Sequence, residues 1–318
     1  MTQPQGAPTS ASELTAIKHD IIKQLFLKTA DQTYVVARWC FLNQLYLDFY
    51  WNAVHGLEKH LKAVLLMNGC SAKAPAGGPA YGHNVVKLFE AVRSLAPTLL
   101  PTILTRPEDL QIRRWRDETV EDFLKRIYDL GQGENRYNIF GFSQQPEDLH
   151  KLDMVIFAIR KLCVPLDAPY FGRRPDRAND KTFRKILTEH PGTVLRRVGT
   201  RFYELIGRKG TEAVREAALT HNLPFAPADY DHGELRNRSS GDNPVLYRRI
   251  IVYAEGGTQR GEDALGLAQI CEWLITNVQL SSDVKGQIQV AKNKLLAQSR
   301  KADRSVSEPE TGTEGRME

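Results

Sequence analysis

The run Arg136-Tyr137-Asn138 carries side chains that suit a phosphate-bearing ligand. A planar guanidinium such as that of Arg136 can donate two parallel hydrogen bonds to phosphate oxygens, and the Tyr137 ring can stack or hydrogen-bond beside it. A structural role suits the same residues, with Arg136 capping a helix end and Tyr137 packing between helices. The residues alone leave both interpretations open.

Glu58, Lys62 and His83 are the other side chains that we single out as ligand contacts. Glu58 and Lys62 stand four residues apart, so on a helix they form a pair on one face. His83 precedes an expected helix, where an imidazole can accept hydrogen bonds from first-turn N–H groups. A solvated helix face and a helix cap are the structural alternatives to a binding site.

Basic residues gather in one stretch, although the net charge of the whole chain is only +5. Residues 173–209 hold eleven Lys and Arg against four Asp and Glu, a net charge of +7. Such a patch attracts phosphate groups more strongly than the overall charge suggests. The residues that we expect to form it are Arg173, Arg174, Arg177, Arg184, Lys185, Arg196, Arg197 and Arg201.

The cysteines give no sign of a metal site or of disulfides. Cys40, Cys70, Cys163 and Cys271 are far apart, without the close ligand spacing of a zinc site, and we expect small buried thiols in a reducing compartment. The first twelve residues lack the basic and apolar regions of a secretory signal, and no apolar run reaches membrane-spanning length. We therefore expect a cytoplasmic protein without a metal, a cofactor or a membrane span.

Apolar residues recur at helical spacing through most of the chain, and alternating strand patterns are scarce. This pattern predicts an all-α, up-and-down helical bundle with a helical C-terminal extension or a second helical domain. The expected helices are 10–25, 30–45, 50–67, 85–92, 120–130, 152–163, 181–189, 193–206, 211–219, 263–278 and 282–298.

Composition divides the chain into expected segments. The Pro-, Asp- and Arg-rich stretch before residue 181 is typical of a linker, and the Ser-, Thr- and acid-rich C-terminus is typical of disorder. The segments are a disordered start (1–11), a helical bundle (12–166), a linker (167–180), a basic-to-mixed helical region (181–298) and a disordered acidic tail (299–318).

Three short motifs occur in order along the first half of the chain. The first is a helix pair, with Ala30-Asp31 and Ala37, then Leu45-Tyr46, then Ala53 followed by Glu58-Lys59 and Leu61-Lys62-Ala63. The second is Gly82-His83-Asn84 followed by Lys87-Leu88, and the third is Asn135-Arg136-Tyr137-Asn138 before a helix. Together they resemble the HEPN family of helical nucleotide- and RNA-associated domains, over about residues 12–166.

The resemblance implies a choice between cleavage and binding. Many HEPN members are metal-independent ribonucleases with an Arg followed at short spacing by a His, which would serve as acid or base while the Arg stabilises phosphorane charge. After Arg136 the first histidine is His150, too far for that motif. The spacing recurs at Arg184 to His190 and at Arg215 to His221, as expected by chance, and Arg215 with His221 is our weaker catalytic alternative.

The Arg-Tyr form of the third motif looks more like the HEPN subset thought to bind phosphate ligands without cutting RNA. We therefore expect a non-catalytic, homodimeric binder of a nucleotide or an RNA phosphate. One alternative is a metal-independent RNA endonuclease of toxin or phage-defence type, with a nucleotidyltransferase-type protein as its partner in a toxin–antitoxin pair. The other is a structural interaction protein with no nucleic-acid partner.

Overall fold

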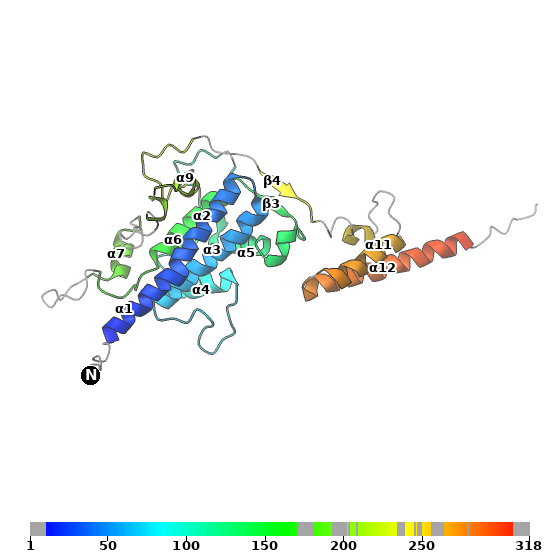
Figure 1. Cartoon of the computed structure of the whole chain (residues 1–318), viewed down its shortest axis with the longest axis horizontal. Helices are drawn as coiled ribbons and strands as arrows, with labels where there is room; N and C mark the ends of the chain where they lie inside the picture. The colour runs from blue at the N-terminus through cyan, green and yellow to red at the C-terminus, as the bar shows by residue number, and fades with distance from the viewer. Residues whose placement is uncertain are drawn as a thin grey trace, which may run out of the picture. The chain divides into compact units, whose positions relative to one another are not determined.

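The computed structural model describes residues 11–112, 114–170, 181–192, 202, 204–207, 209–233, 239–244, 246, 250–255, 264–278 and 280–307. The described part is mostly helical, which confirms the all-α prediction (Figure 1). None of its helices carries an apolar stretch of the length that a bilayer crossing requires.

The chain forms two compact units. We call residues 1–133 and 143–240 the N-terminal unit, and residues 134–142 and 241–318 the C-terminal unit. The contacts thus group residues 181–240 with the N-terminal helices. The boundaries expected from composition, at 166 and 181, stay a prediction about independently folding domains.

A long helical stretch opens the N-terminal unit. It consists of α1 (Ala11–Ile22), a π-helical turn (Lys23–Leu27) and α2 (Lys28–Leu42), without the break that we expected between residues 25 and 30. No Gly or Pro occurs in this stretch to end a helix, and the π turn absorbs the change in the periodicity of the apolar residues. The expected start at Ser10 lies outside the described residues.

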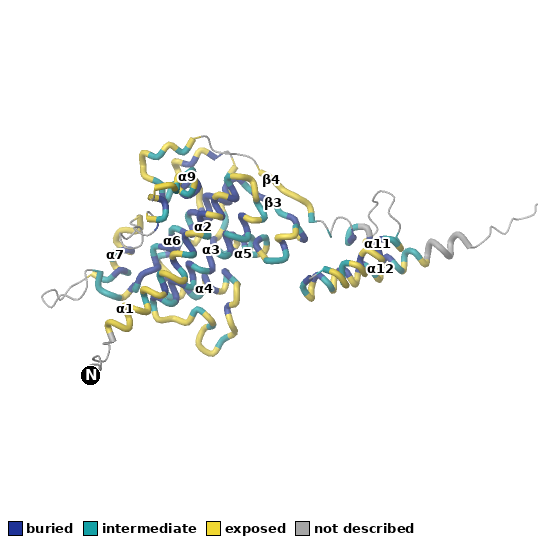
Figure 2. Tube along the Cα trace, in the orientation of Figure 1, coloured by how far each residue is buried: buried dark blue, intermediate teal, exposed yellow. Residues whose placement is uncertain are grey.

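The helix pair expected from the first motif is present. After a three-residue turn, in which Gln44 has a φ of +64°, the chain reverses into α3 (Tyr46–Met67). α3 ends at Asn68-Gly69, as predicted, and Gly69 takes the left-handed conformation (φ +76°) that favours glycine at a helix end. Figure 2 shows α2 and α3 among the most deeply buried elements.

Shorter elements complete the N-terminal unit. Asn84 caps α4 (Val85–Leu95), and Thr119 caps α5 (Val120–Leu130) through a side-chain oxygen that accepts from Asp122 N. Strands β1 (Ile103–Leu104) and β2 (Glu118–Thr119) pair in antiparallel fashion. The remaining helices are α6 (Asp148–Lys161), α7 (Phe183–Glu189) and α9 (Glu212–Leu219). Most of the helix expected at 193–206 lies outside the described residues.

Two buried ion pairs fix α6 against α2. Asp31 accepts from Arg160 Nε and Nη2 at 2.8 and 2.9 Å, and Arg38 pairs with Asp153, with all four side chains at most 3% exposed. On each helix the charged residues stand seven apart, and the order of the charges allows both pairs only when the helices run antiparallel. A parallel arrangement would place like charges together, so the pairs specify both direction and register.

Arg38 also fixes α9. Its Nε donates to Ala217 O at 2.9 Å, and Nη2 donates to Thr220 O. These carbonyls belong to the last turn of α9, where backbone acceptors lack helical partners.

The C-terminal unit is built on a helical hairpin. α11 (Ala264–Asn277) packs on α12 (Ser282–Ser307), and the short α10 (Val252–Ala254) lies against α12. α12 runs nine residues beyond its expected end at 298, so the tail predicted as disordered begins within a helix. Residues 308–318 lie outside the described part.

Residues 134–142, which lie between two segments of the N-terminal unit in the sequence, also belong to the C-terminal unit. This segment contains a 3-10 turn, η2 (Gly133–Tyr137), and the start of β3 (Phe142–Gln144), which pairs with β4 (Ser240–Asp242). Ile139 is 8% exposed within the hairpin core, and Glu134 accepts a hydrogen bond from Ser281 Oγ at 2.9 Å. The C-terminal unit therefore needs residues from two distant parts of the chain.

Three cysteines, Cys40, Cys163 and Cys271, are buried free thiols, as expected. Cys70 is exposed, because it follows the glycine that ends α3 and begins the loop to α4.

Candidate functional site

Glu58 is the centre of a polar cluster that contains three of the residues predicted to bind a ligand. Glu58 Oε1 accepts from Lys62 Nζ at 2.6 Å, and His83 Nδ1 lies 3.0 Å from Oε2. His55 Nδ1 is 3.6 Å from the same Oε2, and its ring contacts Trp51 edge-on with centroids 4.0 Å apart. The structure thus brings His83 to the Glu58–Lys62 pair that the spacing predicted, and it adds His55, one helical turn before Glu58, which the sequence analysis missed.

The electrostatics of this cluster hold Glu58 as a carboxylate. Burial raises the pKa of Glu58, but hydrogen bonds from His55, Lys62 and His83 outweigh it and lower the pKa to about 2. The His83 side chain is 77% exposed and its Nδ1 faces Glu58, so its other ring nitrogen remains toward solvent. The cluster can therefore present one oriented imidazole at the surface.

Arg136, Tyr137 and Asn138 belong to the C-terminal unit, whereas Glu58, Lys62 and His83 belong to the N-terminal unit. Arg136 is exposed and Tyr137 is 72% exposed. Asn138, with a φ of +56°, donates through Nδ2 to Asp242 at 2.7 Å.

Most of the predicted basic patch lies outside the described residues, namely Arg173, Arg174, Arg177, Arg196, Arg197 and Arg201. Of the two members that are described, Arg184 forms a two-pronged pair with Asp167, at 2.7 and 2.9 Å. Lys185 is exposed. The described part of the patch therefore offers one cation already bound to a carboxylate and one open to solvent.

The histidines bear on the catalytic alternative. His150, the first histidine after Arg136, is buried on α6, and burial followed by the charge of Arg38 lowers its pKa to about 3. His221 is 7% exposed and lines a cavity of about 360 Å³ with Trp39 and His232. Arg215 is exposed and is not among the residues that line that cavity.

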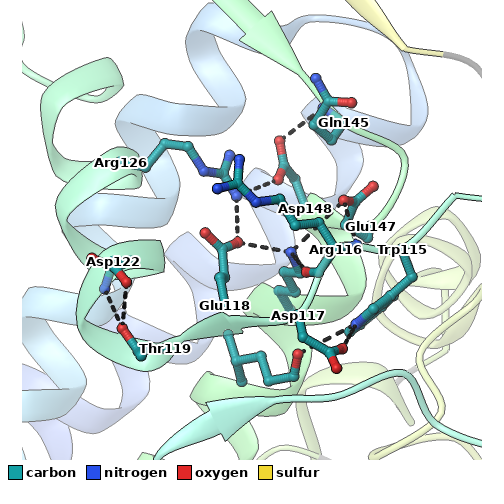
Figure 3. A network of polar contacts seen from close by, with 12 residues as sticks. Trp115, Arg116, Asp117, Glu118, Thr119, Asp122, Arg126, Gln145, Glu147 and Asp148 are labelled. Atoms are coloured by element: carbon teal, nitrogen blue, oxygen red, sulfur yellow. Dashed lines mark hydrogen bonds and ion pairs between the residues drawn. The ribbon is translucent and has the colours of Figure 1, made fainter.

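A larger polar cavity, of about 1060 Å³, lies between the segment before α5 and the start of α6. Glu118 is the centre of one wall: its Oε1 lies 2.7 Å from Arg126 Nη2 and accepts from Lys151 Nζ at 2.8 Å (Figure 3). Arg126 also pairs with Asp148 at 2.8 Å, and Asp148 accepts from the Tyr50 hydroxyl at 2.9 Å. These charges therefore compensate one another within the protein.

The network has clear effects on ionisation. Burial raises the pKa of Glu118, but hydrogen bonds from Arg126 and Lys151 outweigh it and lower the pKa. Burial likewise opposes the charged form of Arg126, yet the Asp148 carboxylate raises the Arg126 pKa. The wall is thus a set of paired charges at neutral pH.

Arg114, Trp115 and Arg116 line the same cavity. Trp115 Nε1 donates to Asp117 at 2.9 Å, and Lys151 Nζ lies 5.2 Å from the Trp115 ring centroid. Arg114 and Arg116 are exposed, and no hydrogen bond or ion pair joins either guanidinium to another described residue. These two cations are therefore available to a ligand.

Sequence reasoning missed this cavity. A signal was present, because an aromatic residue between two arginines is a common pattern in nucleic-acid-binding surfaces. What the pattern did not reveal is that residues 143–151 meet residues 114–126 to form a hollow.

Comparison with known proteins assigns no family: no family model, curated protein or solved structure matches the chain. Among the described residues, no three His, Cys, Asp or Glu side chains converge as metal ligands would.

Proposed function

We propose that this protein is a non-catalytic, HEPN-like binding protein that recognises the phosphate of a nucleotide or of RNA, with the cavity beside Trp115 as its principal site. The observation that carries the proposal is the pair of exposed guanidiniums, Arg114 and Arg116, at a polar cavity of about 1060 Å³. A guanidinium binds phosphate through parallel N–H donors, and here neither is engaged by a described carboxylate.

The placement of charges around the cavity supports an anionic group beside Arg114 and Arg116. The wall carboxylate Glu118 is neutralised by Arg126 and Lys151, so it does not cancel the charge of the two arginines. Asp117 accepts from the Trp115 indole, a further internal partner. The lining carries four basic and four acidic side chains, so its formal net charge is zero; within it, Arg114 and Arg116 are the two basic side chains that no described carboxylate engages.

Binding of a labelled single-stranded RNA at several salt concentrations tests this proposal. If both arginines contact phosphates, the logarithm of the association constant falls with the logarithm of salt concentration with a slope of about −1.4 from these two residues. The double variant Arg114→Ala/Arg116→Ala should weaken binding and reduce the slope by about that amount. Lys125→Ala is the matched control, since Lys125 is exposed on α5 but does not line the cavity.

An unchanged affinity and slope in the double variant would refute the cavity as the phosphate site. Arg136→Ala and Tyr137→Ala then become the decisive variants, because the Arg136-Tyr137-Asn138 run remains our second candidate for phosphate contact. His83→Ala and Lys62→Ala test the Glu58 cluster in the same assay.

The endonuclease alternative has its own test. Purified protein is incubated with labelled RNA in EDTA, and cleavage that is abolished by His221→Ala or Arg215→Ala would replace the binding proposal with a catalytic one. Absence of any RNA or nucleotide affinity at low salt would favour the structural interaction protein. The proposed homodimer is tested by the mass of the protein in solution.

A further inference from the structure

The cavity beside Trp115 contains features beyond those that phosphate binding requires. Trp115 lines it, and the one polar group of the indole is already engaged, donating to Asp117 and to Leu104 O at 3.3 Å. What remains of Trp115 for a ligand is the surface of its ring. An aromatic ring beside free guanidiniums is the arrangement that stacks a base while its phosphate is held.

Two of the residues that line the cavity each have a buried polar atom without a hydrogen-bond partner among the described residues. Glu147, which is 4% exposed, uses Oε1 to accept from Arg116 N at 3.4 Å, whereas its Oε2 has no partner. Arg126 uses Nη2 for its ion pairs, whereas its Nη1 has no partner. Buried polar atoms are rarely left unpaired, so an unpaired acceptor and an unpaired donor in one cavity point to a ligand that supplies their complements.

We propose that the cavity recognises a whole nucleotide unit, with the base stacked on Trp115 and its polar edge on Glu147 Oε2 and Arg126 Nη1, while Arg114 and Arg116 hold the phosphate. The inference rests on the proposed function, which requires only the phosphate. A nucleobase edge carries adjacent donors and acceptors, so it complements a carboxylate and a guanidinium at once. Inorganic phosphate and a sugar phosphate have no aromatic face to stack on Trp115, so neither makes this contact.

The unit could come from a free nucleotide or from single-stranded RNA, since both present the same chemistry. A base paired within a duplex has its polar edge occupied and its faces stacked, so duplex RNA does not fit this mode.

Calorimetric titration of the full chain separates the base from the phosphate. The probes are the four nucleoside 5′-monophosphates, ribose 5-phosphate, inorganic phosphate, a short single-stranded RNA and the same RNA as a duplex. We expect at least one nucleotide or the single strand to bind roughly 10- to 100-fold more tightly than ribose 5-phosphate, the range that one stacked base supplies. The nucleotide arm and the single-strand arm identify the source.

Substitutions assign the base contacts. Trp115→Ala should remove the stacking part of the nucleotide preference, roughly 10- to 100-fold, and leave the affinity for ribose 5-phosphate unchanged, while Trp115→Phe keeps most of the preference because it keeps a ring. Glu147→Gln should change the ranking among the four bases, since it replaces a carboxylate by an amide that also donates. Lys125→Ala again serves as the control, and circular dichroism confirms that each variant is folded.

The outcomes distinguish the two proposals. Equal affinity for ribose 5-phosphate and for every nucleotide and strand overturns base recognition but leaves phosphate binding intact. A nucleotide preference that is undiminished in folded Trp115→Ala also overturns it. No binding of any phosphate compound overturns the proposed function itself.

Discussion

Removing Arg38 tests whether the buried pairs between α2 and α6 hold the fold in register. In Arg38→Met, Asp153 would stay buried with the Tyr34 hydroxyl, at 2.5 Å, as its remaining charge-stabilising partner, and two carbonyls of α9 would lose their donor. Breaking a fully buried pair costs about 3–5 kcal/mol, and orphaned carbonyls add to the cost. Domains have only about 5–15 kcal/mol of stability, so the variant should be marginal.

The pH dependence of that cost has a definite sign. Burial raises the pKa of Asp153 even with Arg38 present, and loss of the cation raises it further. A carboxyl whose folded pKa is raised favours the folded state at low pH and loses that contribution as pH rises through the folded pKa. The deficit of Arg38→Met relative to the natural protein should therefore be smaller at pH 5 than at pH 8.

Urea denaturation and thermal denaturation, each followed by circular dichroism, measure these costs. We expect Arg38→Met to lower the unfolding free energy by about 3–5 kcal/mol and the midpoint temperature by roughly 6–20 °C, taking about 2–4 °C per kcal/mol. Asp153→Asn should cost less, because the Arg38 guanidinium keeps two carbonyl acceptors. The double variant Arg38→Met/Asp153→Asn should cost less than the sum of the singles.

The control is the exposed pair of Asp167 and Arg184, for which Asp167→Asn should cost at most about 1 kcal/mol. If Arg38→Met also costs less than about 1 kcal/mol, or if the double variant equals the sum of the singles, the pairs do not lock the register as we argue.

Two further predictions concern α3 and its neighbours. Because the folded pKa of Glu58, about 2, lies below the usual value of about 4.3, its hydrogen bonds stabilise the fold above pH 4.5 and are lost as pH falls toward 2. Glu58→Gln should lower the unfolding free energy by roughly 1–3 kcal/mol at pH 7, allowing for the exposure of His83, and should reduce the change of that free energy between pH 4.5 and 2.5, measured by urea denaturation. An unaltered pH dependence would contradict this. Gly131→Ala should lower the unfolding free energy, measured by thermal unfolding, by about 2 kcal/mol or more, because an added Cβ would lie 2.4 Å from Tyr50 O. Gly192→Ala is the control and should leave the stability unchanged, because nothing lies within 4 Å of the added Cβ. Equal effects of the two substitutions would disprove the steric argument.

Local signals in the sequence predicted the helices well. The stop of α3 at Asn68-Gly69, the Asn84 cap of α4 and the bounds of α5 all follow from residues within a few positions of the element concerned. The missing break between α1 and α2 was harder to predict, because apolar residues at 21, 25 and 30 changed phase without a helix-breaking residue. A π turn that shifts the phase leaves no local mark in composition.

The candidate site was predictable only in part. Glu58 and Lys62 are neighbours on one helix, so spacing alone placed them together. The cavity beside Trp115 depends on Lys151 reaching Arg116 O at 2.7 Å across 35 positions of the sequence. Contacts between polar residues far apart in the chain have no periodicity, so no pattern in the sequence predicts them.

The core of the C-terminal hairpin depends on residues 134–142, which come from the middle of the chain. A polypeptide ending near residue 240 would retain Ile139 but lose the helices that cover it, and an isolated hairpin would keep those helices without the side chain that fills them. Each fragment would then present apolar surface to water. During synthesis, residues 134–142 emerge well before α11 and α12. The Ile139 side chain therefore stays exposed until the last quarter of the protein has been made.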